Sequence, residues 1–478
     1  MFKQIFKLLA LIWFVITKLY IKTKAKIEIF LREKILTKKI IFTLWLLSIF
    51  VISTTITLPG IKLKQNSLDP NSFLGVIDIV GGGGLSNFSI MALGIGPFIT
   101  ASLIMMIAQT KLFPPVHRLS NSGPLGRKKI NIITRILTIF IAIIQSIVLI
   151  KTVVDRQENN FIIIEDNSIG FKYVALPLVL IGGSLFALFL GEQITEKGVG
   201  NGTSLLIFSG IASRLQSTFR HAFNYFLGNG KDAATISNTI VFILYIVAFL
   251  VLIFIIARFH LAERKIPIQQ TGAGMTRNVK DISYLPIKIN PAGIMPVIFA
   301  LILLSLPTLF SNLLDPYTSP TRNWIEKNLR ITNPIGFSIF IVLVFLLSIG
   351  MGLQQSRVDK IAEDFSKNST FIPGVRPGEQ TEDYLISVVL RLSFFSAIFL
   401  IVLASLQPIL HFIGIPISVT FSGTSLIILV TTALETISQI KARRQSEMIS
   451  KKRKQMAKQI NSKHNKHSNK KKDTFLLW

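Results

Sequence analysis

The feature that most constrains this chain is a series of apolar runs, each about as long as a bilayer is thick. Half of the 478 residues are hydrophobic, and a soluble protein of that composition would expose large apolar patches to water. A helix that crosses a membrane needs about 20 predominantly apolar residues. We therefore expect an all-α, polytopic membrane protein with ten spans, at residues 40–59, 85–110, 130–150, 173–191, 203–219, 236–257, 291–311, 335–355, 384–408 and 421–440.

Basic residues are unevenly divided between the two sides that these spans define. One set of tails and loops carries 39 Lys and Arg, whereas the other set, which includes residues 214–235, carries 11. Cytoplasmic segments of membrane proteins are enriched in Lys and Arg. Both termini and the long loops at 258–290 and 356–383 are therefore expected in the cytoplasm, with the chain in the plasma membrane.

The two ends of the chain are basic as well. Residues 5–16, IFKLLALIWFVI, are apolar but precede lysines rather than a small-residue cleavage site. This pattern favours a cytoplasmic, interfacial amphipathic segment at residues 1–39 that touches anionic lipids, with an uncleaved extra span as the alternative. The tail at 441–478 is lysine-rich and expected to be disordered. It has the charge to touch lipid headgroups or RNA phosphates.

The second span is interrupted by glycines. Asp69 and Pro70 can begin a helix as N-cap and first residue, but the run Gly81–Gly84 ends it after about eleven residues, too few to cross the hydrocarbon. The sequence GIGP at 94–97 predicts a new helix from Pro97. Irregular backbone at membrane depth has to be enclosed by protein or water, so the segment is expected to line a cavity. The alternative is a glycine-rich external loop followed by an ordinary helix.

The second long loop contains FIPGVRPGEQTEDY. Its prolines and glycines predict a tight turn that presents Arg376. The alternative for these charges is a solvated, salt-bridged surface.

Motifs of catalysis and of metal or nucleotide binding are missing from the sequence. It has no cysteine, no HExxH, GxSxG or phosphate-binding loop, and its six histidines have no ligand spacing. Acidic residues near the middle of the spans, which ion-coupled transporters need, are also scarce. We expect neither an enzyme nor a cofactor or metal.

Four motifs resemble those of the SecY family, the channel subunit of the bacterial Sec protein translocase. They are GGGLSNFSIMALGIGPFITASLI, GEQITEKGVGNG, AERKIPIQ with LPIKINPAGIMPVIFA, and FIPGVRPGEQTEDYL, and the resemblance covers roughly residues 38–445. It implies two pseudo-symmetric five-helix halves, at 40–219 and 236–440, around a pore for unfolded polypeptide, with a lateral opening between the second, third, seventh and eighth spans. The partners it implies are SecE, SecG, the SecA motor, the ribosome with its nascent chain and ribosomal RNA, YidC and SecDF.

The resemblance also assigns roles to individual residues. The pore ring maps to Ile99, Leu103, Ile207, Ile298 and Ile428. The plug, at 70–84, includes Pro70, Asn71, Phe73, Val76, Ile79, Gly81, Gly82, Gly83 and Gly84. Contacts with SecA or the ribosome map to Arg264, Lys265, Arg357 and Arg376. The chain departs from the family at HRLSNSGPLGRKK and at QTGAGMTRNVKD, which is less basic than usual.

Two other classes of protein remain as alternatives. A secondary transporter also has inverted repeats and broken helices, but it needs convergent polar groups at mid-membrane. A polytopic lipid enzyme needs a cluster of acidic or histidine residues at one face.

Overall fold

The computed structural model describes residues 34–63, 81, 83–85, 87–110, 113–155, 162–164, 168, 170–228, 236–270, 283–311, 319–331, 333–416 and 419–475. The chain divides into two compact units. The large unit comprises Leu47–Glu192 and Thr203–Leu434. The small unit comprises Met1–Leu46, Gln193–Gly202 and Glu435–Trp478.

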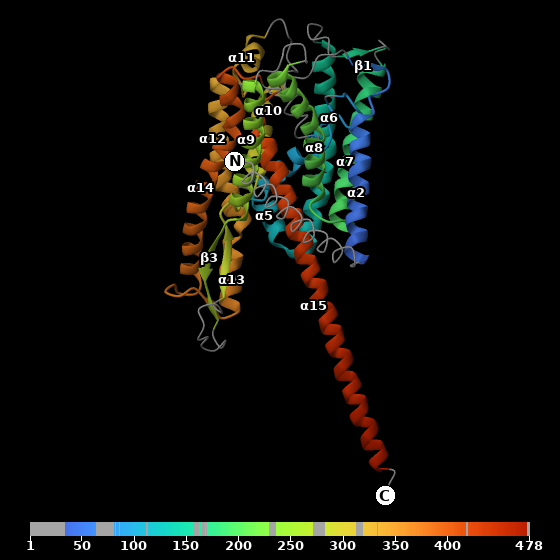
Figure 1. Cartoon of the computed structure of the whole chain (residues 1–478), viewed down its shortest axis with the longest axis vertical. Helices are drawn as coiled ribbons and strands as arrows, with labels where there is room; N and C mark the ends of the chain where they lie inside the picture. Colours follow the sequence, from blue (N-terminus) through green and yellow to red (C-terminus); the bar gives the residue numbers. More distant parts are fainter. Residues whose placement is uncertain are drawn as a thin grey trace, which may run out of the picture. The chain divides into compact units, whose positions relative to one another are not determined.

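Ten helices of the described residues coincide with the ten expected spans (Figure 1). In chain order they are α2 (Lys34–Thr55), α4 (Gly96–Ala108), α6 (Gly123–Asp155), α7 (Leu176–Lys197, after the π-helical turn η1, Phe171–Ala175), α8 (Gly202–Leu227), α9 (Ile236–Leu261), α10 (Met295–Ser311), α12 (Pro334–Ser356), α14 (Glu379–Phe412) and α15 (Gly423–Phe475). Seven described helices are long and apolar enough to cross a membrane, and α4 and α10 are shorter apolar helices. The expected helical membrane fold is confirmed.

Two helices run further than the sequence predicted. α8 continues to Leu227, beyond the expected end of its span at residue 219. α15 continues through the lysine-rich tail to Phe475, whereas the sequence led us to expect disorder at 441–478. Its sequence after Gly423 has no further glycine and no proline. Lysine, arginine, glutamine and methionine, which are common there, are good helix formers.

Helices of the large unit pack in two groups. α4 packs on α6, while α12 contacts both α10 and α14, beside which it lies in Figure 1. The approach of α12 to α14 is close, because a Cβ on Gly352 would overlap the Ser393 hydroxyl, and small residues allow such contact in membranes. α10 also contacts α4 and α6. The helices of the expected lateral opening are therefore neighbours.

Aromatic rings join α8 to α9, the last helix of the first half and the first helix of the second. Phe219 packs edge-on to Phe249, with ring centroids 5.2 Å apart. Phe421, which precedes α15, lies 4.3 Å from Phe249 and 4.7 Å from Tyr245. The Tyr245 hydroxyl donates a hydrogen bond of 2.7 Å to the Val419 carbonyl. These contacts fix the start of α15 to the helices where the halves meet.

The two long loops that were expected in the cytoplasm are joined by backbone pairing. β3 (Glu263–Pro267) pairs antiparallel with β5 (Tyr284–Lys288), and β4 (Gln269–Gln270) of the first loop pairs with β6 (Thr370–Phe371) of the second. The second loop also forms a helix, α13 (Val358–Lys367). The remaining elements are α5 (Pro114–Asn121), α11 (Pro320–Asn328), and β1 (Ile61–Leu63) paired with β2 (Ile162–Ile164).

Candidate functional site

Described residues between Gly83 and Ile95, called the glycine segment below, form buried irregular backbone. The Ser89 hydroxyl donates to the Gly84 carbonyl at 2.8 Å, and a Cβ on Gly84 would overlap the Met91 carbonyl oxygen. Phe88 is 2% exposed and Ile95 is fully buried. Enclosure by protein is what irregular backbone at membrane depth requires. The burial therefore favours the expected broken helix over an external loop.

The plug expected at 70–84 is described only in part. Gly81, Gly83 and Gly84 belong to the described residues, whereas Pro70, Asn71, Phe73, Val76, Ile79 and Gly82 lie outside them. The new helix predicted after the second glycine break is present, since α4 begins at Gly96 with Pro97 in its first turn.

Neighbouring elements hold the glycine segment at several points. The Leu58 amide donates to the Phe88 carbonyl at 3.1 Å, and the Ile90 amide donates to the Ile56 carbonyl at 3.2 Å. A Cβ on Gly183 of α7 would overlap the Ile90 carbonyl. The apolar side chains around the segment form one core cluster: Leu58, Ile61, Leu85, Phe88, Ala92, Leu93, Leu149, Ile150, Leu176 and Leu180.

Gly83 lies against one face of α8. A Cβ built on it would be 3.2 Å from Nε of Arg214 and 3.5 Å from the Gly210 carbonyl. Residues three and seven positions apart share a helix face, so Ile207, Gly210 and Arg214 lie on the same face of α8. Seven residues of helix correspond to about 10 Å. The glycine segment therefore reaches α8 about 10 Å along the helix from the expected pore-ring residue.

The five expected pore-ring residues are all buried in the large unit. They lie on four helices: Ile99 and Leu103 on α4, Ile207 on α8, Ile298 on α10 and Ile428 on α15, with exposed fractions between 2% and 6%. Every one is aliphatic, and an apolar constriction blocks ions because it excludes water. Their assembly into a single collar remains a prediction.

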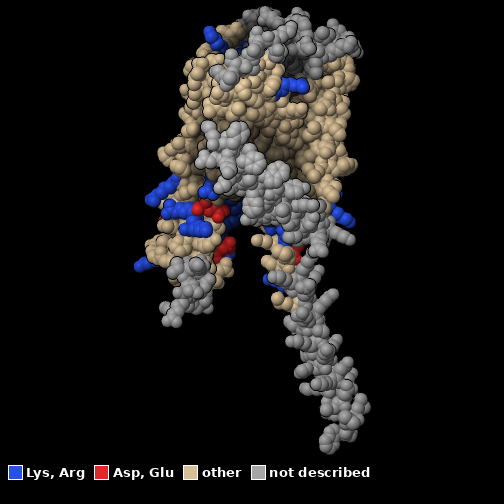
Figure 2. Space-filling view, viewed as in Figure 1, with Lys and Arg blue, Asp and Glu red and all other residues tan. Residues whose placement is uncertain are grey.

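A shared apolar core makes the two long loops one body, which we call the loop body. Its buried members come from both loops and from α14: Ile266, Ile287, Val358, Ile372, Leu385, Val388 and Val389. Figure 2 shows Lys, Arg, Asp and Glu side chains gathered in the lower left of the view, where β3 and α13 lie in Figure 1, below a wide tan surface. The loop body is thus the charged end of the large unit.

Two of the expected partner-binding residues lie on β3 and are exposed. Adjacent strand residues point to opposite faces, so Arg264 shares a face with buried Ile266, and Lys265 lies on the other. Lys265 Nζ lies over the ring of Tyr284, 4.6 Å from its centroid, which is a cation–π distance. The structure therefore brings Arg264 and Lys265 to the same hairpin but not to the same face.

The two remaining basic residues are exposed at the ends of rigid elements. Arg357 joins α12 to α13 in the left-handed conformation, with φ 44° and ψ 50°. Arg376 follows the turn Ile372–Val375, in which the Val375 amide donates to the Ile372 carbonyl at 3.0 Å and Gly374 has φ 84°. Proline and then glycine at the centre define a type II turn. The tight turn predicted from sequence is confirmed.

The small unit contains the end of the GEQITEKGVGNG motif. The Gly198 amide donates to the Ile194 carbonyl at 2.9 Å, which ends α7, and the Gly202 amide donates to the Thr195 hydroxyl at 2.9 Å. Arg443 of α15 donates from Nη1 to the Gly198 carbonyl at 2.6 Å. The motif's glycine-rich turn is therefore held partly by an arginine that follows it by 245 residues.

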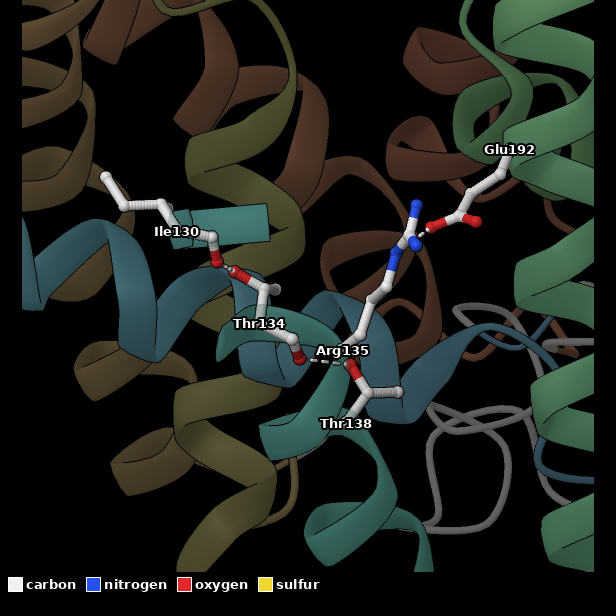
Figure 3. A network of polar contacts seen from close by, with 5 residues as sticks. All are labelled: Ile130, Thr134, Arg135, Thr138 and Glu192. Carbon is white, nitrogen blue, oxygen red and sulfur yellow. Dashed lines mark hydrogen bonds and ion pairs between the residues drawn. The ribbon is translucent and has the colours of Figure 1, made fainter. Parts of the chain in front are cut away.

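The beginning of the same motif makes an ion pair within the large unit. Arg135 Nε on α6 lies 2.7 Å from Glu192 Oε1 on α7, and Figure 3 shows the two side chains reaching toward each other. Beside this pair, the hydroxyls of Thr134 and Thr138 each donate to the carbonyl one turn earlier on α6. Among the described residues, no group of His, Asp or Glu is placed to hold a metal ion.

Sequence reasoning missed three residues that organise these regions. Arg214 was included both in the expected span 203–219 and in the loop 214–235, and its contact with Gly83 was not expected. The contacts of Thr43 and Arg443 with the GEQITEKGVGNG turn have no local signal in the sequence, because their partners lie far away in the chain.

Comparison with known proteins agrees with these features. The sequence profile of the SecY family matches residues 89–437. The protein translocase subunit SecY of Mycoplasma capricolum is 36% identical over 465 residues, which cover 93% of this chain and 95% of the relative. The subunit of the same name from Bacillus subtilis is 36% identical over 420 residues, covering 86% of this chain and 95% of the relative.

Solved structures share the fold at low sequence identity. A structure described as that of a protein-conducting channel aligns with a TM-score of 0.63 and 17% identity, over 86% of this chain and 93% of that one. Sec61 from the canine ribosome–channel complex of the endoplasmic reticulum aligns with a TM-score of 0.57 and 16% identity, over 86% and 93% of the two chains. The family profile and these relatives establish that the chain belongs to the SecY family.

Proposed function

We propose that the glycine segment and the five apolar ring residues close a pore through which unfolded polypeptide passes. Membership of the SecY family makes the chain the pore-forming subunit of the Sec translocon, a channel and not an enzyme. The observation that carries the proposal is the contact of Gly83 with the face of α8 that bears Ile207. It supports a gate because a segment on that face lies in line with the collar.

An apolar collar suits a channel whose substrates have no common sequence. Aliphatic side chains offer no hydrogen bond or charge to a passing chain, so each segment binds weakly and moves on. A secondary transporter would instead need convergent polar groups for its substrate at this depth. The buried, aliphatic character of Ile99, Leu103, Ile207, Ile298 and Ile428 favours the channel over a transporter.

We assign the supply of energy for transport to partner proteins that bind the loop body. Arg264, Lys265, Arg357 and Arg376 are exposed there, and arginine suits paired hydrogen bonds with carboxylate or phosphate. We assign these residues to the SecA motor and to the translating ribosome, with ribosomal RNA as a source of phosphates. SecE and SecG complete a heterotrimer, and YidC and SecDF are further partners. A ribosome complex is described for one structural neighbour, canine Sec61.

The proposed orientation follows from charge. The excess of Lys and Arg on the loop body and on both tails supports a cytoplasmic location for them, with the chain in the plasma membrane. Membrane-protein helices then leave the pore between α4 and α6 on one side and α10 and α12 on the other, where α10 contacts both α4 and α6.

The proposed gate is tested by the ion conductance of purified channels in planar bilayers. Deletion of residues 70–80 and replacement of Ile207 and Ile428 by Asn should each raise the conductance of the resting channel, the first by removing a plug and the second by hydrating the collar. Replacement of Leu244, which is 67% exposed on α9, by Ala is the control. Unchanged conductance after both changes would refute the gate.

A further inference from the structure

Arg214 is a charged residue in the middle of α8 (Gly202–Leu227). The proposed collar and docking surface make no use of it. A charged side chain in a membrane helix costs free energy and usually has a functional reason. Arg214 is half-buried. It lies on the same helix face as Ile207, two turns further along the helix.

The Arg214 guanidinium covers the backbone of Gly83. A Cβ on Gly83 would lie 3.2 Å from Nε and 3.7 Å from Nη2, and Gly83 has φ 94°. This conformation favours glycine, and a Cβ at this position would press against the guanidinium. A guanidinium is planar and more weakly hydrated than an ammonium group, so it can lie flat against a peptide unit where a lysine could not. The contact therefore depends on a glycine at position 83 and on a planar guanidinium at position 214.

We propose that Arg214 is a positioning residue that holds the glycine segment on the pore face of α8 in the closed channel. The inference rests on the proposed gate, because Gly83 and Gly84, which begin the glycine segment, are also the last residues of the expected plug. The contact can be kept only while Gly83 stays on α8. When the segment moves away, water replaces it around the guanidinium. The charge is therefore in contact with the glycine segment in the closed channel and with water in the open channel.

The same helix supplies a matched control. Arg220 lies six residues further along α8 and is exposed. Replacing Arg220 by Met removes the same charge from the same helix without touching Gly83. A difference between the Arg214 and Arg220 variants therefore reports the contact and not the net charge of α8.

The test compares Arg214→Met, Arg214→Lys and Arg220→Met by resting conductance in planar bilayers, normalised to the amount of channel. Coupling between two sites is commonly 5- to 150-fold, and we expect the conductance to rise about tenfold for Arg214→Met. We expect a smaller rise for Arg214→Lys, which keeps the charge but lacks the planar group, and none for Arg220→Met. Arg214→Met channels with parental conductance at normal abundance would overturn the inference.

Gly83→Ala tests the same contact by changing the glycine instead of the arginine. If Arg214→Met does not accumulate in the membrane, Arg214→Lys replaces it in the comparison. If the two residues act through one contact, the Gly83→Ala, Arg214→Lys double variant should leak little more than Gly83→Ala alone. A double variant whose increase in conductance equals the sum of the two single increases would contradict the inference. Deletion of residues 70–80 separates it from the proposed gate. If the deletion raises the conductance and the Arg214 variants do not, the proposed gate stands but Arg214 has no positioning role. If neither the deletion nor the Arg214 variants raise the conductance, both the gate and the inference are refuted.

Discussion

The amide of Val199 donates a hydrogen bond of 2.9 Å to the hydroxyl of Thr43, although 156 residues separate the two in the chain. The same hydroxyl donates to the Lys39 carbonyl at 2.9 Å, and it would overlap a Cβ on Gly198. Thr43 of α2 and Arg443 of α15 thus hold consecutive residues of one turn. The small unit is therefore assembled from three distant segments around the glycines of GEQITEKGVGNG.

Loss of the Thr43 hydroxyl should destabilise the small unit. Thr43→Val keeps the shape of the side chain but leaves the buried Val199 amide without this acceptor, at a cost of about 1–3 kcal/mol. Thr43→Ser keeps the hydroxyl and should retain more stability. The two variants can be compared by thermal unfolding in detergent, monitored with a dye on a cysteine introduced at Lys441, which is exposed. Equal unfolding temperatures for both would mean that the hydrogen bond contributes nothing.

Arg443 should matter through its hydrogen bond to Gly198 and not through its charge alone. Arg443→Met removes the donor that lies 2.6 Å from the Gly198 carbonyl, and we expect a lower unfolding temperature. Lys441→Met removes the same charge two residues earlier from an exposed position, where surface substitutions usually change stability by less than about 0.5 kcal/mol. A Lys441 variant as unstable as the Arg443 variant would contradict this assignment.

Arg357 allows backbone and side-chain roles to be separated. Its left-handed conformation costs a non-glycine residue roughly 1–2 kcal/mol, so Arg357→Gly should fold at least as well as the parent. Arg357→Glu keeps that strain and reverses the charge. If the guanidinium binds a partner, both variants should accumulate normally yet transport less protein in reconstituted vesicles. Parental transport by the Gly variant would reduce Arg357 to an exposed surface charge.

Partner binding through the loop body should depend on salt in a way that identifies the partner. If Arg264 and Arg376 contact ribosomal RNA, each phosphate contact should add about 0.7–0.9 to the slope of log affinity against log salt. Arg376→Gln should then reduce the slope by about one contact, because the Ile372–Val375 turn that precedes it is held independently of the side chain. A slope that Arg376→Gln leaves unchanged would exclude a phosphate contact there.

The orientation can be tested directly because the chain has no cysteine. A single cysteine at Thr370, in β6 of the loop body, should react with a membrane-impermeant maleimide only after the cells are broken. A cysteine at Arg330, after α11, should react in intact cells. Labelling of position 370 from outside intact cells would invert the proposed topology.

The sequence predicted the positions of helices and turns better than it predicted which segments contact each other. Hydropathy located the ten spans, and proline and glycine located both the start of α4 and the turn before Arg376, because these signals act within a few residues. The pairing of β4 with β6 and the hold of Arg443 on Gly198 join segments that only tertiary packing brings together. Hydropathy ended the fifth span at residue 219, whereas α8 continues to Leu227, because Arg214, Arg220 and the polar residues between them lower the hydropathy of this stretch.

Site-specific photocrosslinking tests the central claim most directly. A photoreactive amino acid at Ile207, on the proposed pore face of α8, is compared with one at Leu244, which is 67% exposed on α9, while a secreted protein is arrested part-way through the channel. The proposed pore predicts adducts between the arrested protein and position 207, lost when the substrate is released, and none from position 244. Adducts at 244 and none at 207 would show that the polypeptide does not pass the apolar ring.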